Sequence, residues 1–448
     1  MVEKNRATLG GRLSAVLVAA GSAVGLGNIW RFPYIAGENG GGAFLIIYIG
    51  CILLLGIPVL LSEFAIGRHT HKNSVGAYRS LSKRWTPLGY NSVISSLLIL
   101  GFYFVVSGWT LEYFATSVSG AIAEFTSSAV NAEKFTAFTT NPLRPIICTI
   151  LFALLTHTVI ALGVQKGIER SSKLLMPVLF VMLIVLAIRS IMMPNGLEGL
   201  RFFFNPDFSK VTGKTFLDAM GQAFFTLSIG MGAMLIYGSY FKEGTKIAGT
   251  AISVVSLDTV VALTAAVIIF SAGVENESGM QLAFVAMPKV FSSMPFGNLW
   301  ATLFFLLLGL AALSSTISMH EAVTSYFVEK RGMSRKAGAA IVTIGALLLS
   351  TACSLSLGAW SEFKVVGMNL FALLDSFTAI VMLPVLGILT SIFVGWIWKK
   401  EDMRAELTAE GGVDKATYPF IRFLLKWVCP VLVSVVFIFG IIDFINSL

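Results

Sequence analysis

Five polar side chains interrupt otherwise apolar runs of this chain, and all five present oxygen atoms. They are Asn28, Thr226, Asp258, Ser314 and Ser315. Oxygen atoms replace the water around a small cation, and an acidic group within an apolar run is a functional hypothesis by default. These residues therefore predict a cation site, although paired serines such as Ser314 and Ser315 are also common where two membrane helices pack together.

Two glycine-containing segments add backbone atoms to this chemistry. Residues 21–33 read GSAVGLGNIWRFP, and residues 221–233 read GQAFFTLSIGMGA. A helix that faces lipid cannot unwind there, because each freed backbone group would cost several kcal/mol in hydrocarbon. Two interrupted spans in the two halves of one chain indicate a transporter binding site.

The predicted breaks would free both carbonyl and amide groups. The carbonyls are those around Gly21, Ala23, Val24, Phe225, Thr226 and Ser228. They are suited to a small cation. The amides near Leu26 and Gly27 begin the following half-helix, whose positive dipole end favours a carboxylate. The segments therefore predict adjoining sites for a cation and a carboxylate.

The composition is that of an integral membrane protein. The 448 residues are 56% hydrophobic and 12% charged, their mean hydropathy is +0.83, and soluble proteins carry about 25% charged residues. Eleven apolar stretches are long enough to span a bilayer. They lie at about 11–37, 42–68, 88–122, 144–163, 168–190, 215–240, 245–273, 298–328, 334–357, 365–397 and 420–446. We predict an all-α integral membrane protein with eleven transmembrane helices and a single transmembrane domain, residues 1–448.

The net charge of +8 follows membrane topology and does not indicate a nucleic-acid partner. Lys and Arg gather in alternate connections, as the positive-inside rule requires if the N-terminus is cytoplasmic. Eleven spans then place the C-terminus outside. The cysteines and histidines have no metal or disulfide spacing, and no catalytic dyad is present. We therefore predict that the chain is not an enzyme, and infer no obligate protein partner besides membrane lipid.

Two long motifs resemble the neurotransmitter:sodium symporter family. Residues 20–44, AGSAVGLGNIWRFPYIAGENGGGAF, are similar to its first span, and residues 221–240, GQAFFTLSIGMGAMLIYGSY, to its sixth. The resemblance implies a five-plus-five inverted repeat over about 11–190 and 215–397, with broken helices 1 and 6 and an extra helix at about 420–446. Eleven spans rather than twelve indicate a bacterial member in the inner cell membrane, similar to carriers of several hydrophobic amino acids.

The resemblance also implies ligands for two sodium ions and a substrate. The first ion would be bound by the Ala23 carbonyl, Asn28, Thr226, Asp258 and the substrate carboxylate. The second would be bound by the carbonyls of Gly21, Val24 and Ala311 and the hydroxyls of Ser314 and Ser315. The substrate would contact Ala23, Leu26, Gly27, Ile99, Tyr103, Phe225, Thr226, Ser228, Met231, Ser315 and Met319.

Gates on both sides of the pocket are implied as well. The outer gate would consist of Tyr103, Phe225, Arg31 and Asp375, and the inner gate of Arg6 and Glu329. Glu63 would cap amides freed in the sixth span. Without the resemblance, Arg6 and Glu329 would be read as a solvated surface pair, which contributes little.

Gly25 indicates the class of substrate. Monoamine-carrying relatives have an aspartate at the position that matches Gly25, so here the substrate must bring its own carboxylate. The side-chain pocket would be lined by Ile99, Tyr103, Phe225, Met231 and Met319. Such a pocket would reject charged side chains, and flexible methionines adapt to ligands of different shapes. We expect sodium-coupled import of hydrophobic L-amino acids, from aliphatic to aromatic, by alternating access.

Two alternatives remain open at this stage. A proton-coupled amino-acid permease of the same architecture would keep the glycine breaks but lack Asp258 and the paired serines. An ion channel would need a continuous polar path.

Chloride-independent relatives often have a glutamate at the position of Ala262, and Asp258 lies one helical turn earlier on the same face. Asp258 is therefore expected to supply that charge, so that transport needs no chloride.

Overall fold

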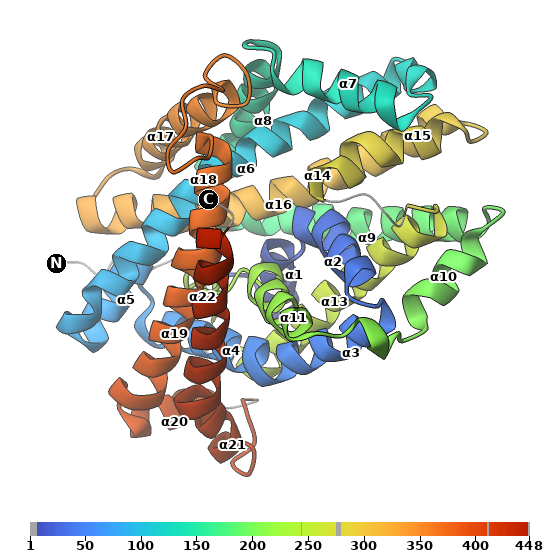
Figure 1. Ribbon diagram of the computed structural model, residues 1–448. Coiled ribbons are helices and arrows are strands. Elements are labelled where there is room, and N and C mark those ends of the chain that lie inside the picture. Colours follow the sequence, from blue (N-terminus) through green and yellow to red (C-terminus); the bar gives the residue numbers. More distant parts are fainter. Residues whose placement is uncertain (1–6, 243, 275–278, 410–411, 447–448) are drawn as a thin grey trace.

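The protein is almost entirely helical (Figure 1), as described by a computed structural model over residues 7–242, 244–274, 279–409 and 412–446. Within these ranges, nine helices are long and apolar enough to cross a membrane. A tenth span results if α1 (Arg12–Ala23) is joined to Gly27–Glu38 across their bend of 58°. The all-α membrane fold is confirmed.

The count of eleven spans stays a prediction because of the stretch at 215–240. That stretch divides into α11 (Gly213–Thr226) and α12 (Ala233–Gly238). At 1.5 Å per residue, α11 extends over only about 21 Å, which is less than the hydrocarbon core of a bilayer. The predicted inverted repeat likewise remains a prediction.

The other long helices agree with the predicted spans to within a few residues. They are α3 (Gly42–Cys51) with α4 (Ile57–Thr70), α6 (Thr86–Val118), α8 (Arg144–Ala161), α9 (Arg170–Ile191), α13 (Ile247–Ser271), α16 (Gly297–Arg331), α17 (Arg335–Leu355), α18 (Leu370–Ser376) with α19 (Leu383–Ile392), and α21 (Tyr418–Phe423) with α22 (Cys429–Asn446). The agreement follows from the length of apolar chain that a bilayer requires.

Shorter helices connect these spans. They are α5 (Ser74–Leu81), α7 (Ser128–Thr139), α10 (Gly196–Phe204), α14 (Gly279–Gln281), α15 (Met287–Ser292) and α20 (Lys400–Thr408), whereas α2 (Phe32–Glu38) ends the broken first span. The polar connection at about 399–419 contains one of them, the helix α20. Side-chain caps explain where some of them begin, because the Asn73 side chain accepts a hydrogen bond from the Gly76 amide at the start of α5.

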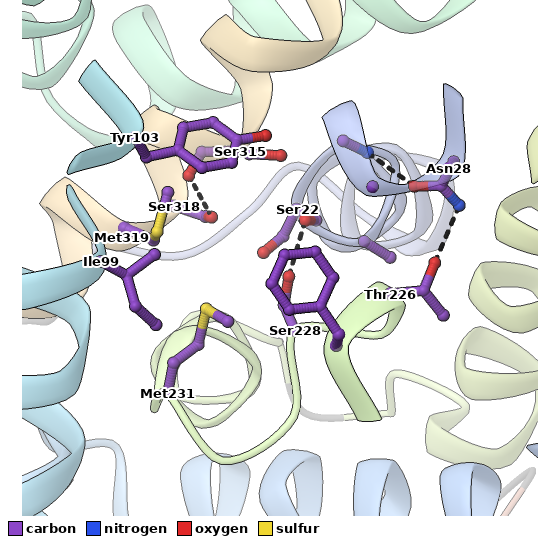
Figure 2. A pocket seen from close by; sticks show the side chains of 14 residues that line it. Ser22, Asn28, Ile99, Tyr103, Thr226, Ser228, Met231, Ser315, Ser318 and Met319 are labelled. Atoms are coloured by element: carbon purple, nitrogen blue, oxygen red, sulfur yellow. Dashed lines mark hydrogen bonds between the residues drawn. The ribbon is translucent and has the colours of Figure 1, made fainter. Parts of the chain in front are cut away.

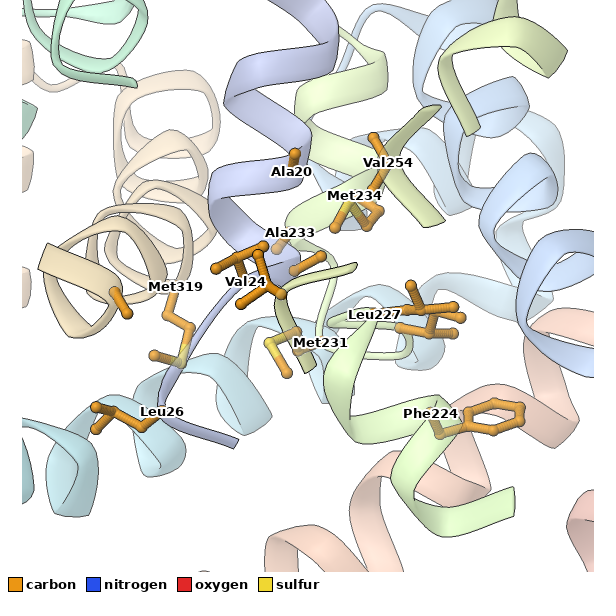
Figure 3. Packing of buried hydrophobic residues seen from close by; sticks show 14 of the residues in the cluster. Ala20, Val24, Leu26, Phe224, Leu227, Met231, Ala233, Met234, Val254 and Met319 are labelled. Carbon is orange, nitrogen blue, oxygen red and sulfur yellow. The ribbon is translucent and has the colours of Figure 1, made fainter. Parts of the chain in front are cut away.

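The two broken helices lie in the middle of the bundle (Figure 1). α1 packs against α12, α13 and α16, and the long helices α6 and α16 pack along each other beside it. Figure 3 shows Val24 from the first break, Met231 from the second and Met319 from α16 within one apolar cluster. The fold therefore brings both breaks to the same place, against the α6–α16 pair.

The contact between α4 and α12 depends on Gly67. A Cβ atom at Gly67 would lie 2.0 Å from the Leu235 carbonyl oxygen, closer than two such atoms can approach. Because that neighbour is backbone, it cannot move aside without displacing α12. α12 also begins at the second break, so this close approach helps to position the site.

We predict that Gly67→Ala lowers the free energy of unfolding by about 1–3 kcal/mol, since overpacking separates the helices. Gly50→Ala is the matched control in the same span, because a Cβ atom at Gly50 meets nothing within 4 Å. Thermal unfolding of the purified variants in detergent measures both. Equal melting temperatures for the two variants would contradict the argument.

Candidate ion and substrate site

The first break leaves backbone groups that the surrounding side chains satisfy. Val24 is extended (φ −70°, ψ 108°), so its carbonyl no longer follows the helix. The Gly25 amide donates to the Asn28 side-chain oxygen at 2.9 Å, and the Leu26 amide donates to the Tyr103 hydroxyl at 3.1 Å. The helix therefore opens without leaving these two amides unpaired.

The second break needs left-handed backbone at Ser228, Gly230 and Gly232, where φ is 51°, 87° and 76°. Glycine adopts this region at little cost, whereas serine does so rarely. The Gly230 amide donates to a Glu63 carboxylate oxygen at 2.7 Å. The predicted cap by Glu63, which is 2% exposed, is thus confirmed.

Further hydrogen bonds connect the second break to its surroundings. The Ser228 hydroxyl donates to the Ser22 carbonyl of the first break at 2.8 Å. The Ser96 hydroxyl on α6 donates to the Met231 carbonyl at 2.6 Å. The two breaks are therefore joined to each other and to α6.

The side chains predicted for a first ion meet in one buried cluster. The Asn28 amide group donates to the Thr226 hydroxyl at 2.8 Å and to the Asp258 carboxylate at 2.7 Å. The Thr226 hydroxyl donates to both Asp258 carboxylate oxygens at 3.0 Å. None of the three residues is more than 2% exposed. Three separate helices thus meet at one point, where Thr226 and Asp258 present the oxygen atoms that a small cation requires and Asn28 presents its amide nitrogen, while its oxygen accepts from the Gly25 amide.

The residues predicted for a second ion also come together. The hydroxyls of Ser314 and Ser315 both lie 3.4 Å from the Val24 carbonyl oxygen. The Ser314 hydroxyl also donates to the Ala311 carbonyl at 2.9 Å. Gly21 packs on the same serine, since a Cβ atom at Gly21 would lie 3.5 Å from the Ser314 Cβ. This arrangement gives a second group of oxygen atoms between α1 and α16.

A small cavity of about 30 Å³ lies between the breaks, α6 and α16 (Figure 2). Ten of the predicted substrate contacts line it, namely Ala23, Gly27, Ile99, Tyr103, Phe225, Thr226, Ser228, Met231, Ser315 and Met319. Ser22, Gly25, Asn28 and Ser318 also line it, although they were not predicted as substrate contacts. Ser318 follows Ser315 by three residues on α16, a spacing that places both on one face.

The predicted contact Leu26 lies in a second cavity of about 350 Å³, which we call the vestibule. Its lining includes Trp30, Arg31, Tyr34, Phe102, Phe371 and Asp375. Tyr103 and Phe225 line both cavities and therefore lie between them. Leu26 is connected to the small cavity through its amide, which donates to the Tyr103 hydroxyl.

The two charged residues of the predicted outer gate do not touch. The Arg31 guanidinium lies over the Phe225 ring, 4.5 Å from its centroid. Arg31 and Asp375 both line the vestibule, yet they are not among the ion pairs within 4.0 Å in the described ranges. A cation over an aromatic face is attracted by the ring. Phe225 lines the small cavity, and Arg31 therefore lies on the vestibule side of Phe225.

At the other end of α1, the predicted inner gate is described in part. The Glu329 carboxylate accepts hydrogen bonds from the Asn73 backbone and side-chain amides at 2.8 and 2.7 Å. Its predicted partner Arg6 lies outside the described residues.

The sequence analysis did not predict a buried charged network that connects to the segment before α1. Glu321 on α16 is fully buried and accepts hydrogen bonds from the Tyr240 hydroxyl and, at 2.5 and 3.0 Å, from Arg335. The Leu9 amide donates to the Tyr240 carbonyl at 2.9 Å. The network thus joins the segment before α1 to the end of α12 and to α16 and α17. An acid within the 298–328 apolar stretch was the available signal.

Two further polar residues lie beside the Asn28–Thr226–Asp258 cluster. Gln222 precedes Thr226 by one turn of α11, and Tyr48 interacts electrostatically with Asp258. Both are fully buried. Both polar side-chain atoms of Gln222 have no hydrogen-bond partner in the described part of the chain, whereas the Tyr48 hydroxyl interacts with Thr226 and Asp258. Such groups are costly unless something satisfies them.

Comparison with known proteins gives consistent matches over the whole length. The family model described as the sodium:neurotransmitter symporter family matches residues 6–142 and 140–447. The uncharacterized sodium-dependent transporter YhdH of Bacillus subtilis is 35% identical, over 99% of this chain and 100% of its own. An uncharacterized sodium-dependent transporter of Haemophilus influenzae is 34% identical, over 97% and 98%. The crystal structure of MhsT in complex with L-phenylalanine superposes with a TM-score of 0.88 at 41% identity, over 97% of this chain and 99% of that one.

Proposed function

The chain belongs to the sodium:neurotransmitter symporter family, and we propose that it imports hydrophobic L-amino acids together with sodium ions. As a member it is a sodium-dependent, multi-pass membrane transporter and not an enzyme. The main support for this proposal is the small cavity. Its apolar lining adjoins the two helix breaks and the Asn28–Thr226–Asp258 cluster.

We assign recognition of the substrate carboxylate to the first break. The Leu26 amide and the Tyr103 hydroxyl already meet there, and an amide at the start of a half-helix favours an anion. A Cβ atom at Gly25 would lie 2.7 Å from the Ser315 hydroxyl oxygen and 3.1 Å from that of Tyr103. Because no acidic side chain fits at Gly25, the carboxylate has to come with the substrate. The complex of MhsT with L-phenylalanine supports this assignment.

Selectivity for the substrate side chain is assigned to Ile99, Phe225, Met231 and Met319. All four line the small cavity, and none carries a charge that could compensate a buried ionic group. Thioether side chains adapt to different shapes. The cavity volume of about 30 Å³ means that these side chains have to move to admit an aromatic substrate.

Two sodium ions would bind beside the substrate. The first site comprises the Ala23 carbonyl, Asn28, Thr226, Asp258 and the substrate carboxylate, and the second comprises Gly21, Val24, Ala311, Ser314 and Ser315. Substrate and first ion share a contact, so each raises the affinity of the other. Each inward charge gains about 2.3 kcal/mol per 100 mV of membrane potential, so the potential and the sodium gradient both drive uptake.

Transport would proceed by alternating access in a bacterial inner membrane, with the N-terminus cytoplasmic and the C-terminus outside. The vestibule then faces outward, and Tyr103, Phe225, Arg31 and Asp375 form the outer gate. Arg6 and Glu329 would form the inner gate. The bundle of spans 1, 2, 6 and 7 would rock against the remaining spans. All of them belong to a single domain, made of the repeats at about 11–190 and 215–397 and the extra helix, which is surrounded by lipid and has no obligate protein partner.

Uptake into liposomes tests the function and the second sodium site together. The wild-type chain should accumulate labelled leucine and phenylalanine under an inward sodium gradient, but not under a proton gradient alone. Ser314→Ala combined with Ser315→Ala removes two ligand oxygens, so half-maximal uptake should need about tenfold more sodium, the loss of about 1.4 kcal/mol of binding. Uptake driven equally well by protons, or an unchanged sodium requirement in the double variant, would overturn the respective assignment.

Met231→Phe should weaken binding of tryptophan more than binding of leucine. A larger side chain at Met231 narrows the small cavity, and overpacking costs about 1–3 kcal/mol, most for the largest ligand. Competition binding with both amino acids measures the difference. Leu26→Met is the control, because Leu26 lines the vestibule and does not line the small cavity. An equal loss for both ligands would mean that Met231 does not face the substrate side chain.

Chloride should not be required for transport. The buried Asp258 carboxylate can balance the charge of the sodium ions at the position one turn before Ala262. Uptake by the wild-type chain should be the same in gluconate and in chloride buffer. In Asp258→Asn, sodium binding should weaken strongly, and the unpartnered side-chain amide of Gln222 makes partial rescue by chloride the expected result. Loss of wild-type uptake in gluconate would rule out Asp258 as the counter-charge.

A further inference from the structure

A basic pocket of about 380 Å³ lies where α20 and α21 meet, at the lower end of α19 and α22 in Figure 1. Five cationic side chains line it together with aromatic ones. The lining comprises Lys400, Arg404, Lys415, Arg422 and Lys426 with Tyr418, Pro419, Phe423 and Trp427. No acidic residue belongs to this lining. The transport site uses none of these residues, so the pocket needs an explanation of its own.

The sequence of α20 separates its charges onto two faces. Lys400 and Arg404 are four residues apart and line the basic pocket, since this spacing places side chains on one side of a helix. Asp402 and Glu406 have the same spacing on another face. Glu406 there pairs with Arg68 of α4, the nitrogen and oxygen being 2.5 Å apart. Glu406 is therefore turned away from the pocket, whereas Lys400 and Arg404 line it and Glu401 acts on Tyr418 at its edge.

The cations of the pocket lack internal counter-charges. None of the five belongs to an ion pair within 4.0 Å in the described ranges. Arg422 and Lys426 again repeat a like charge after four residues, an unfavourable spacing on a helix. Tyr418 is 5% exposed, and its hydroxyl has no hydrogen-bond partner among the described residues. Such a constellation is stabilised by an external anion.

The rim of the pocket has the character of a membrane interface. Trp396 and Trp427 are about half exposed, and their ring centroids are 4.7 Å apart. The Lys426 ammonium lies 3.9 Å from the centroid of the Trp396 ring. Tryptophan gathers at headgroup level in membrane proteins. From there exposed apolar side chains, Phe423, Trp427, Val431, Ile438 and Ile442, continue along α21 and α22.

We propose that the basic pocket binds the headgroup of an anionic phospholipid. Its phosphate oxygens would accept hydrogen bonds from the guanidinium groups of Arg404 and Arg422, whose planar arrangement of N–H donors matches two phosphate oxygens. Its acyl chains would lie on the exposed apolar side of α22. Basic pockets beside membrane helices are suited to such headgroups. The positive-inside rule alone would scatter cations through the connections, whereas here three segments direct them into one concavity.

The test uses the full chain purified in detergent and titrated with short-chain phosphatidylglycerol. Bound lipid is counted by native mass spectrometry, and the melting temperature is followed because a ligand of the folded state raises it. The pocket variant is Arg404→Gln, Arg422→Gln and Lys426→Gln. The matched control is Arg79→Gln, Lys83→Gln and Arg84→Gln, three exposed cations at the same end of the bundle.

Wild type and control should bind phosphatidylglycerol at least about tenfold more tightly than the pocket variant does. They should also bind phosphatidylglycerol more tightly than they bind phosphatidylcholine of the same chain length. The affinity should fall as salt is raised. Arg404→Lys with Arg422→Lys keeps the charge and should restore most of the binding if the first variant proves unstable. Equal binding by pocket variant and control, or no preference over phosphatidylcholine, would overturn the proposal. Equal stabilisation by glycerol phosphate would replace the lipid with a soluble phosphate.

Discussion

Backbone groups freed at the two helix breaks have to find partners within the protein, because the hydrocarbon around the bundle offers none. The described structure meets this demand with side chains from other helices. Tyr103 and Asn28 accept from amides of the first break, Glu63 accepts from the second, and Ser96 donates to it. These bonds allow two helices to stay open in the middle of the membrane. Everything that makes this site chemically different from a packed helical core follows from that constraint.

The same partners also place the site on a scaffold. Tyr103 and Ser96 lie on α6, whereas Ser314, Ser315 and Met319 lie on α16, and these helices pack along each other. Each hydrogen bond between a helix break and α6 or α16 therefore connects a broken helix to a continuous one. A transport cycle has to exchange such bonds for others rather than simply break them. The protein is closed differently at the two ends of α1. At one end, Tyr103 and Phe225 separate the small cavity from the vestibule. At the other end, the buried Glu321 carboxylate pairs with Arg335.

Local patterns predicted much of this molecule. Apolar stretches set the helix bounds to within a few residues, because a bilayer demands a fixed length of apolar chain. Glycine-rich runs located both breaks, and most substrate contacts came from the family resemblance. The helix α20 was missed because its charges read as a polar connection. Arg335 was missed as the partner of Glu321, because an ion pair between two helices leaves no trace in local spacing.

The sequence by itself determined which segments are membrane helices, where two of them break, and which oxygen-bearing side chains stand near the breaks. These properties depend on hydropathy, on glycine and on residue type, all of which are local. Only the tertiary structure decided that Asn28, Thr226 and Asp258 meet within hydrogen-bond distance, that Arg31 lies over Phe225, and that Leu26 lines the vestibule rather than the small cavity. Such contacts join residues tens to hundreds of positions apart. They depend on how the helices pack, and packing is a property of the whole bundle rather than of any one segment.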